Sequence, residues 1–250
     1  MVVAYDGSGF HGFAANAGVP TVATTLAAAI ETVLGHAVTL TAAGRTDRGV
    51  HALGQVVTFD VAAEELDLFR LQRSLNRMVG PTVAVRDITI VGPDFDARFS
   101  ARSRRYRYHV LNRPEPDPFL AATAWHVERP LNRAALDLGC DPFIGEHDFA
   151  AFCRKPTRAD DTEASLVRRV LSASWHDAGE GLLHFDIEAT AFCHQMVRSI
   201  VGTMVEVGLG RRSAGELVAV IRSGDRRFAG DVAPPLGLVL WSVHYDGWAS

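Results

Sequence analysis

The chain has 250 residues, enough for one large domain or two ordinary ones. Hydrophobic residues make up 48% of it and charged residues 22%, a composition typical of globular proteins. No apolar run is long enough to span a bilayer, and the first residues lack the basic start and apolar core of a signal peptide. We therefore expect no membrane contact and a cytoplasmic location.

The formal net charge of -4 argues mildly against nucleic acid as a partner, but binding depends on where the positive charge sits. Nearly all basic residues are arginines, which can grip phosphate with two parallel hydrogen bonds and stack on bases. For any single pair, a solvated surface is the simpler interpretation. The arginines nevertheless cluster in sequence, at Arg102, Arg104, Arg105 and Arg107, at Arg168 and Arg169, at Arg211 and Arg212, and at Arg226 and Arg227.

The three cysteines, Cys140, Cys153 and Cys193, are odd in number, far apart and form no CxxC pair. This pattern indicates neither a disulfide framework nor a zinc site, and we expect buried or idle thiols. The ten histidines are scattered and no pair has ligand spacing, so we expect no metal.

Hydrophobic periodicity predicts the elements of the first half. Apolar residues at helical spacing follow Pro20, with Thr21 as the expected N-cap of a helix over 22–34. The expected elements in chain order are a strand over 2–5, that helix, strands over 37–42 and 55–61, a helix over 66–78 that ends at Gly80-Pro81, and a strand over 83–90.

The second half repeats this order with one helix added. Its expected elements are a strand over 105–110, a helix over 133–143, a hairpin of 165–175 and 182–189, helices over 196–207 and 215–221, and a last strand over 238–243. Both halves read β-α-β-β-α-β, the split unit of ferredoxin-like folds. We predict an α+β fold of two such halves, residues 1–98 and 99–250, with a cleft between them for an extended ligand.

Gly7, Gly9 and Gly12 match the G-x-G-x-x-G pattern of dinucleotide-binding loops directly after a strand. Such a site requires the helix to begin at the loop, so that its N-terminus faces the pyrophosphate. Here the helix is expected only at Thr21. The interpretation we prefer is a glycine-rich loop that allows a tight turn.

The segment Gly44-Arg45-Thr46-Asp47-Arg48-Gly49-Val50-His51 lies in a loop between two apolar strands. Turn chemistry explains Asp47 and Gly49, but it does not explain why Arg45 and Asp47 sit in a loop flanked on both sides by apolar strands. Loops held by a rigid sheet are where catalytic residues concentrate. We therefore interpret this loop as the candidate active site.

GRTDRGVHALGQVVTFD closely resembles the catalytic segment of the tRNA pseudouridine synthase A family. Four further segments resemble that family in the same order: AYDGSGFHGF, FSARSRRYRYHVLN, AFCHQMVRSIVGTMVEVGLG and PPLGLVLWSVHYD. The chain departs from the family pattern at Phe13, Ala14, Ala23-Thr24 and Arg48. The resemblance implies the pseudouridine synthase fold and isomerisation of uridine to pseudouridine without a cofactor.

The resemblance also implies roles for individual residues. Asp47 is the catalytic carboxylate, which either attacks covalently or helps to remove a sugar proton. Arg45 fills the space that the flipped base leaves, although a plain phosphate contact is nearly as good an interpretation. Tyr106 packs its ring on the uracil and can serve a proton step through its hydroxyl, with plain core packing as the alternative interpretation, and Arg198 pairs with the aspartate. Leu238 lines the base pocket.

The remaining expectations concern partners and alternatives. Two further arginines are expected to contact RNA: Arg48, which follows Asp47, and Arg105, which belongs to the cluster Arg102 to Arg107. The resemblance implies uridines 38 to 40 of the tRNA anticodon arm as targets, and a homodimer. The alternatives are a non-catalytic RNA-binding module, a pseudouridine synthase with another RNA target, and a nucleotide-dependent oxidoreductase that rests on the three glycines alone.

Overall fold

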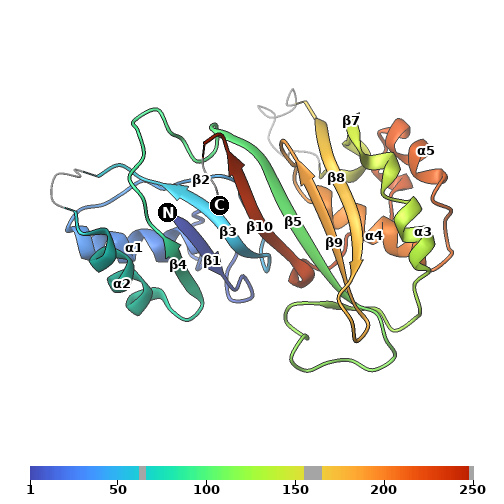
Figure 1. Ribbon diagram of the computed structural model, residues 1–250, viewed down its shortest axis with the longest axis horizontal. Coiled ribbons are helices and arrows are strands. Elements are labelled where there is room, and N and C mark those ends of the chain that lie inside the picture. The colour runs from blue at the N-terminus through green and yellow to red at the C-terminus, as the bar shows by residue number, and fades with distance from the viewer. Residues whose placement is uncertain (62–65, 155–164, 248–250) are drawn as a thin grey trace. The chain divides into compact units, whose positions relative to one another are not determined.

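The computed structural model describes residues 1–61, 66–154 and 165–247 (Figure 1). The chain forms two compact units, the first made of Met1–Arg104 with Val239–Ser250 and the second of Arg105–Leu238. The sequence-based division placed every residue after 98 in the second half. In the structure the chain returns to the first unit at Val239, because the last strand pairs there with an earlier one.

The first unit has the predicted β-α-β-β-α-β order. Its sheet runs β4-β1-β3-β10, with β2 paired to β3 at the side. β1 is antiparallel to β3 and β4, whereas β10 is parallel to β3 through the pairs Val239–His51 and Leu240–Ala52. The elements are β1 (Val2–Tyr5), α1 (Val22–Leu34), β2 (Thr41–Ala42), β3 (His51–Thr58), α2 (Leu68–Val79), β4 (Val83–Asp87) and β10 (Leu238–Tyr245).

Helix α1 begins where the sequence predicts. The Thr21 side chain accepts from the Thr24 backbone N–H, and the Thr24 side chain interacts with the Thr21 backbone N–H, which completes a capping box. Gly35 ends the helix in the left-handed conformation at φ 79°. Helices α1 and α2 pack together, and both bury apolar residues beside the sheet (Figure 1).

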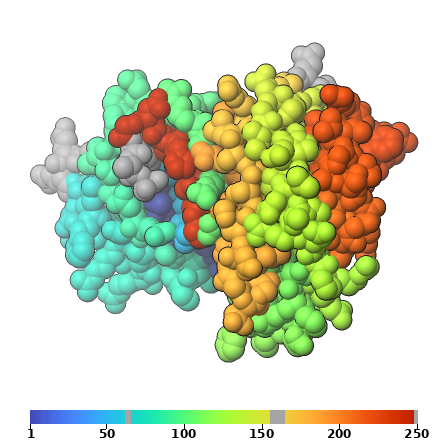
Figure 2. Space-filling view, turned by 45° about the vertical axis from the view of Figure 1, so that its right-hand side comes forward, coloured from blue at the N-terminus to red at the C-terminus, as the bar shows by residue number. Residues whose placement is uncertain are grey.

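The second unit is built on the sheet order β5-β9-β8-β7, with β6 paired to β5. α3 packs against α4 and β8, and α5 packs against β7; Figure 2 shows that α3 and α5 both reach the surface. The elements are β5 (Ala101–Leu111, which begins in the first unit), β6 (Trp125–His126), α3 (Arg133–Leu138), β7 (Gly145–Asp148), β8 (Val167–Asp177), β9 (Leu182–Ala189), α4 (Met196–Gly208) and α5 (Glu216–Ser223).

Four sequence predictions need correction. The strand expected over 37–42 is reduced to Thr41–Ala42, and β3 begins at His51 rather than at residue 55. The helix expected over 133–143 ends at Leu138, where Gly139 caps it, and a short 3-10 helix with Pro142 follows. The thiols of Cys153 and Cys193 are not idle, because these residues form a disulfide across 40 residues of sequence.

Cys140 is free and buried, as predicted. Within the ranges described above, no helix is both long and apolar enough to cross a membrane.

Candidate active site

The loop between β2 and β3 carries three predicted site residues. Arg45 and Arg48 are exposed, Asp47 is half-buried, and Thr46 between them is buried. The Val50 N–H donates to the Asp47 carbonyl at 3.1 Å, and Gly49 closes this turn at φ 77°. The turn therefore presents a carboxylate between two guanidinium groups that water can reach.

Buried polar side chains fix the backbone of this loop. The Tyr5 hydroxyl and Thr46 Oγ1 are 2.8 Å apart, and Gln55 Nε2 donates to the Gly44 carbonyl at 2.7 Å. Burial raises the pKa of Tyr5 to about 12, against the opposing effect of its hydrogen bonds with Thr46 and Gln55. The Tyr5 hydroxyl thus stays protonated at neutral pH and serves as a fixed hydrogen-bonding group beneath the loop.

The glycine-rich segment 7–12 packs against the same loop. Gly12 has φ 91°, and a Cβ added to it would lie 2.8 Å from the Thr46 carbonyl oxygen and 3.3 Å from the Asp47 carbonyl carbon. A Cβ on Gly7 would collide with the Val50 carbonyl. The preferred interpretation of this motif, a loop that turns tightly, is confirmed at Gly12. Since α1 begins only at Val22, the loop lacks the helix N-terminus that a dinucleotide site requires.

Two departures from the family pattern have structural roles in this unit. Phe13 is buried, with its ring centroid 6.2 Å from that of Tyr5, and its N–H donates to the Thr46 carbonyl at 3.1 Å. Thr24 completes the capping box of α1. Phe13 thus belongs to the packing that supports the Asp47 loop.

The second unit carries Tyr106, Arg198, Arg105 and Leu238. Tyr106 is buried and meets Phe192 edge-on, with ring centroids 5.0 Å apart and planes at 86°. Helix α4 is buried along almost its whole length. Only two of its residues, Arg198 and Glu206, are not buried. Leu238 is buried at the start of β10.

Backbone contacts orient Arg198. Its Nε donates to the Ala233 carbonyl at 2.8 Å, and the Ala233 N–H donates to the Arg198 carbonyl at 3.1 Å. Gly202, one turn later in α4, makes this approach possible, because a Cβ there would collide with the Asp231 carbonyl. One residue beyond Ala233, the Pro234 carbonyl accepts from the Tyr108 hydroxyl at 2.7 Å. The segment 231–238 is therefore anchored to both α4 and β5.

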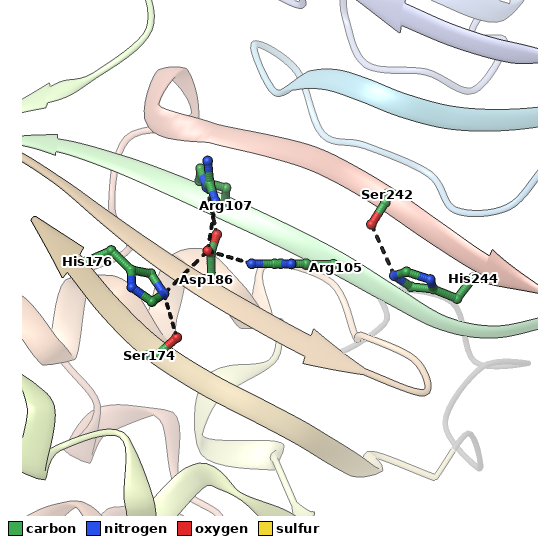
Figure 3. A network of polar contacts seen from close by, with 7 residues as sticks. All are labelled: Arg105, Arg107, Ser174, His176, Asp186, Ser242 and His244. Atoms are coloured by element: carbon green, nitrogen blue, oxygen red, sulfur yellow. Dashed lines mark hydrogen bonds and ion pairs between the residues drawn. The ribbon is translucent and has the colours of Figure 1, made fainter. Parts of the chain in front are cut away.

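A buried carboxylate, that of Asp186, holds two of the arginines of β5 (Figure 3). Arg107 donates to both oxygens of Asp186 at 2.7 and 2.9 Å, and Arg105 donates to one of them at 2.8 Å. Burial alone would raise the pKa of Asp186, but the hydrogen bonds from Arg107 and Arg105 outweigh it and lower that pKa. His176 Nε2 lies 3.6 Å from Asp186 and 2.9 Å from Ser174 Oγ.

Arg105, predicted to contact RNA, therefore already has a carboxylate partner, although its side chain remains 38% exposed. Tyr5, Gln55 and Phe192 lie in segments that resemble the family, but nothing local in the sequence indicated their supporting contacts, and the same holds for Ala233. Among the residues that the structure describes, no three His, Cys, Asp or Glu side chains are grouped so that they could hold a metal ion.

Comparison with known families adds a separate line of information. The family model described as tRNA pseudouridine synthase matches residues 1–100 and 140–246. Curated relatives named tRNA pseudouridine synthase A are similar over nearly their whole length. The relative from Geobacillus sp. (strain WCH70) is 38% identical over 245 residues, which cover 98% of this chain and 96% of that protein.

The relative from Myxococcus xanthus is 39% identical over 249 residues, 99% of this chain and 92% of its own. That from Methylacidiphilum infernorum (isolate V4) is 39% identical over 245 residues, 98% of this chain and 94% of its own. A chain from a crystal structure of a Cbf5-Nop10-Gar1 complex is 13% identical, with a TM-score of 0.36, and the match covers 84% of this chain and 44% of that one.

Proposed function

We propose, from the premise that this chain belongs to the tRNA pseudouridine synthase family, that Asp47 is the carboxylate acting at the sugar of the target uridine. Membership makes the chain an isomerase of uridine in tRNA with the α+β fold of that family. The observation that carries the role of Asp47 is its setting. It is a half-buried carboxylate, on a turn whose backbone Tyr5, Gln55 and Gly12 hold in place.

The reaction breaks the bond between C1′ and N1 of uridine and forms a bond between C1′ and C5. N1 gains a proton and C5 loses one, so atoms and electrons balance without an oxidant, a nucleotide or a metal. We therefore propose that no cofactor takes part. Asp47 either attacks the sugar covalently or removes a sugar proton, and in both routes a rigid turn limits the motion needed to reach the sugar.

The remaining site residues handle the base. A uridine stacked in RNA must be extruded before its glycosidic bond can be reached. In the proposal, the exposed planar guanidinium of Arg45 fills the space that the base leaves. Tyr106, braced by Phe192, packs on the uracil, and Leu238 provides an apolar wall. Arg198 pairs with the catalytic carboxylate.

The proposal extends to the RNA and to assembly. Arg48 and the exposed part of Arg105 contact the RNA backbone. The uridines modified are those at positions 38 to 40 of the anticodon arm, and the enzyme acts in the cytoplasm as a homodimer, as the family resemblance implies. Light scattering at micromolar concentration tests the homodimer, for which a monomer mass would be the contrary result.

The main experiment is mass-shift mapping of pseudouridine in unmodified tRNA transcripts treated with the purified protein. We expect new pseudouridine at positions 38 to 40 and none in an untreated sample. Pseudouridine at other positions of the same transcripts would contradict the anticodon-arm assignment while leaving the reaction class intact. Transcripts of ribosomal RNA, treated in parallel, test for another RNA target.

A further inference from the structure

A cavity of about 430 Å³ lies in the second unit. It is lined by Ala150, Cys153, Arg154, Gln195 and Arg226. These residues come from three segments: the short helix 150–152 with the residues after it, the turn before α4, and the short helix 226–228. The volume falls within the range of ordinary ligand sites.

Two of the three segments that line this cavity are bonded to each other, and the short helix 226–228 packs against the short helix 150–152. The disulfide joins Cys153 to Cys193, and the Arg154 N–H donates to the His194 carbonyl at 3.0 Å. Gln195 has φ 64°, a left-handed conformation that costs energy for a residue with a side chain. Arg226 Nη1 donates to the Gly230 carbonyl at 2.9 Å. The cavity therefore does not have to assemble when a ligand arrives.

The charge of the lining is positive. Neither Arg154 nor Arg226 forms an ion pair with a carboxylate among the residues that the structure describes. The nearest acid in sequence, Asp225, is engaged by Arg227, whose Nε and Nη2 donate to its carboxylate at 2.9 and 2.6 Å. Two guanidinium groups on one cavity, neither of them ion-paired within the described part of the chain, favour an anionic ligand.

We infer that this cavity binds a backbone phosphate of tRNA. The lining contains no aromatic side chain on which a base could stack, so a phosphodiester fits it better than a nucleoside does. Guanidinium groups bind phosphate with two parallel hydrogen bonds, and the Gln195 amide can supply a further donor. This inference rests on tRNA being the substrate of the proposed function.

The test measures the Kd of the full chain for a tRNA transcript over a series of KCl concentrations. We expect Arg154→Ala and Arg226→Ala each to weaken binding about tenfold at moderate salt. Each loss should also reduce the slope of log Kd against log salt by about one. Arg154→Lys should weaken binding less, because it keeps the charge and loses only the forked geometry.

The control is Arg222→Ala, which removes an exposed arginine at the end of α5 that does not line the cavity. Parental Kd and slope in both Arg154→Ala and Arg226→Ala would overturn the inference. An equal loss of affinity in Arg222→Ala would also overturn it, because the loss would then reflect the overall positive charge of the surface and not this cavity. Arg154 is exposed, so thermal melting of Arg154→Ala should match the parent and excludes misfolding as the cause.

Pseudouridine formation by the parent protein, measured on the same transcript, separates this inference from the proposed function. If the parent forms no pseudouridine, the proposed function fails, whatever the arginine variants do. If the parent is active and the cavity variants bind as it does, only the phosphate site fails.

Discussion

Gly12→Ala is the substitution that most directly tests how the Asp47 loop is held. At φ 91° a residue with a Cβ carries strain of roughly 1–2 kcal/mol. The added Cβ would lie 2.8 Å from the Thr46 carbonyl oxygen and 3.3 Å from the Asp47 carbonyl carbon. Both contacts are tighter than ordinary van der Waals separations. We expect the free energy of unfolding to fall by about 2 kcal/mol, and Tm by about 4–8 °C.

The clash requires a shift of the 7–12 loop or of the segment that carries Asp47, and we expect the Asp47 segment to take up part of it. A displacement near 1 Å at a reacting group costs about a hundredfold in rate, so we expect single-turnover pseudouridine formation to fall by about that factor. Release of tritium from C5-labelled uridine in a tRNA transcript, with enzyme in excess, measures this rate. Binding of tRNA should change much less, because no arginine is removed.

Gly9→Ala is the matched control. It makes the same change in the same loop, yet no atom lies within 4 Å of the added Cβ and the φ of Gly9 lies outside the strained region. We expect parental stability and a parental rate. A Gly12→Ala protein with the parental Tm and rate would refute the reasoning, as would an equal loss of rate in Gly9→Ala.

Four further predictions concern chemistry and stability. Asp47→Asn should abolish pseudouridine formation while tRNA binding survives, since affinity comes mainly from phosphate contacts; turnover near the parental rate would remove Asp47 from its role. Arg198→Ala should slow the single-turnover rate more than Arg198→Lys, and neither should reach the parental value, because lysine cannot form a forked pair. Activity on refolded tRNA should persist in excess zinc chelator, and complete loss reversed by stoichiometric zinc would contradict this. Asp186→Asn should lower the free energy of unfolding by about 2 kcal/mol at pH 7. The pKa of Asp186 is lowered in the folded protein, so its contribution to the free energy of unfolding is present above the unfolded pKa near 3.9. That contribution is lost as the pH falls through the folded pKa. The free energies of unfolding of parent and variant should therefore converge in acid denaturation profiles.

Local signals were sufficient for most of the helices, α3 being the exception, and they located most strands without fixing their ends. Apolar spacing and the Thr21 cap predicted α1 at its observed bounds. Both signals depend on residues only a few positions apart, so they can be recognised in the sequence. The start of β3 could not be predicted in this way. A glycine at 54 reads as a break in a strand, but here it allows the Trp241 backbone of β10 to approach closely. That contact joins residues almost 200 positions apart, which no local pattern reveals.

The same limit applies to the cysteines and to the site. Cys153 and Cys193 meet only because the fold brings their Cα atoms to 5.8 Å. Asp47, Tyr106 and Arg198 were identified through resemblance, and their roles stay predictions. The supporting contacts of Tyr5 and Gln55 had no local sequence signal, because a buried tyrosine or glutamine looks like any core residue until its partner is known.

Both units use a glycine to support the chain that carries a proposed site residue. Gly12 lets one loop lie against the backbone of Asp47, and Gly202 lets the segment before β10 lie against the helix of Arg198. In each place the supporting contact is made by backbone atoms, so it does not depend on the identity of the neighbouring side chains. This arrangement tolerates departures from the family pattern such as Phe13, which alters packing while the hydrogen bond from its N–H to the Thr46 carbonyl remains. Substitutions at Gly12 and Gly202 should therefore harm activity more than substitutions of the buried side chains around them.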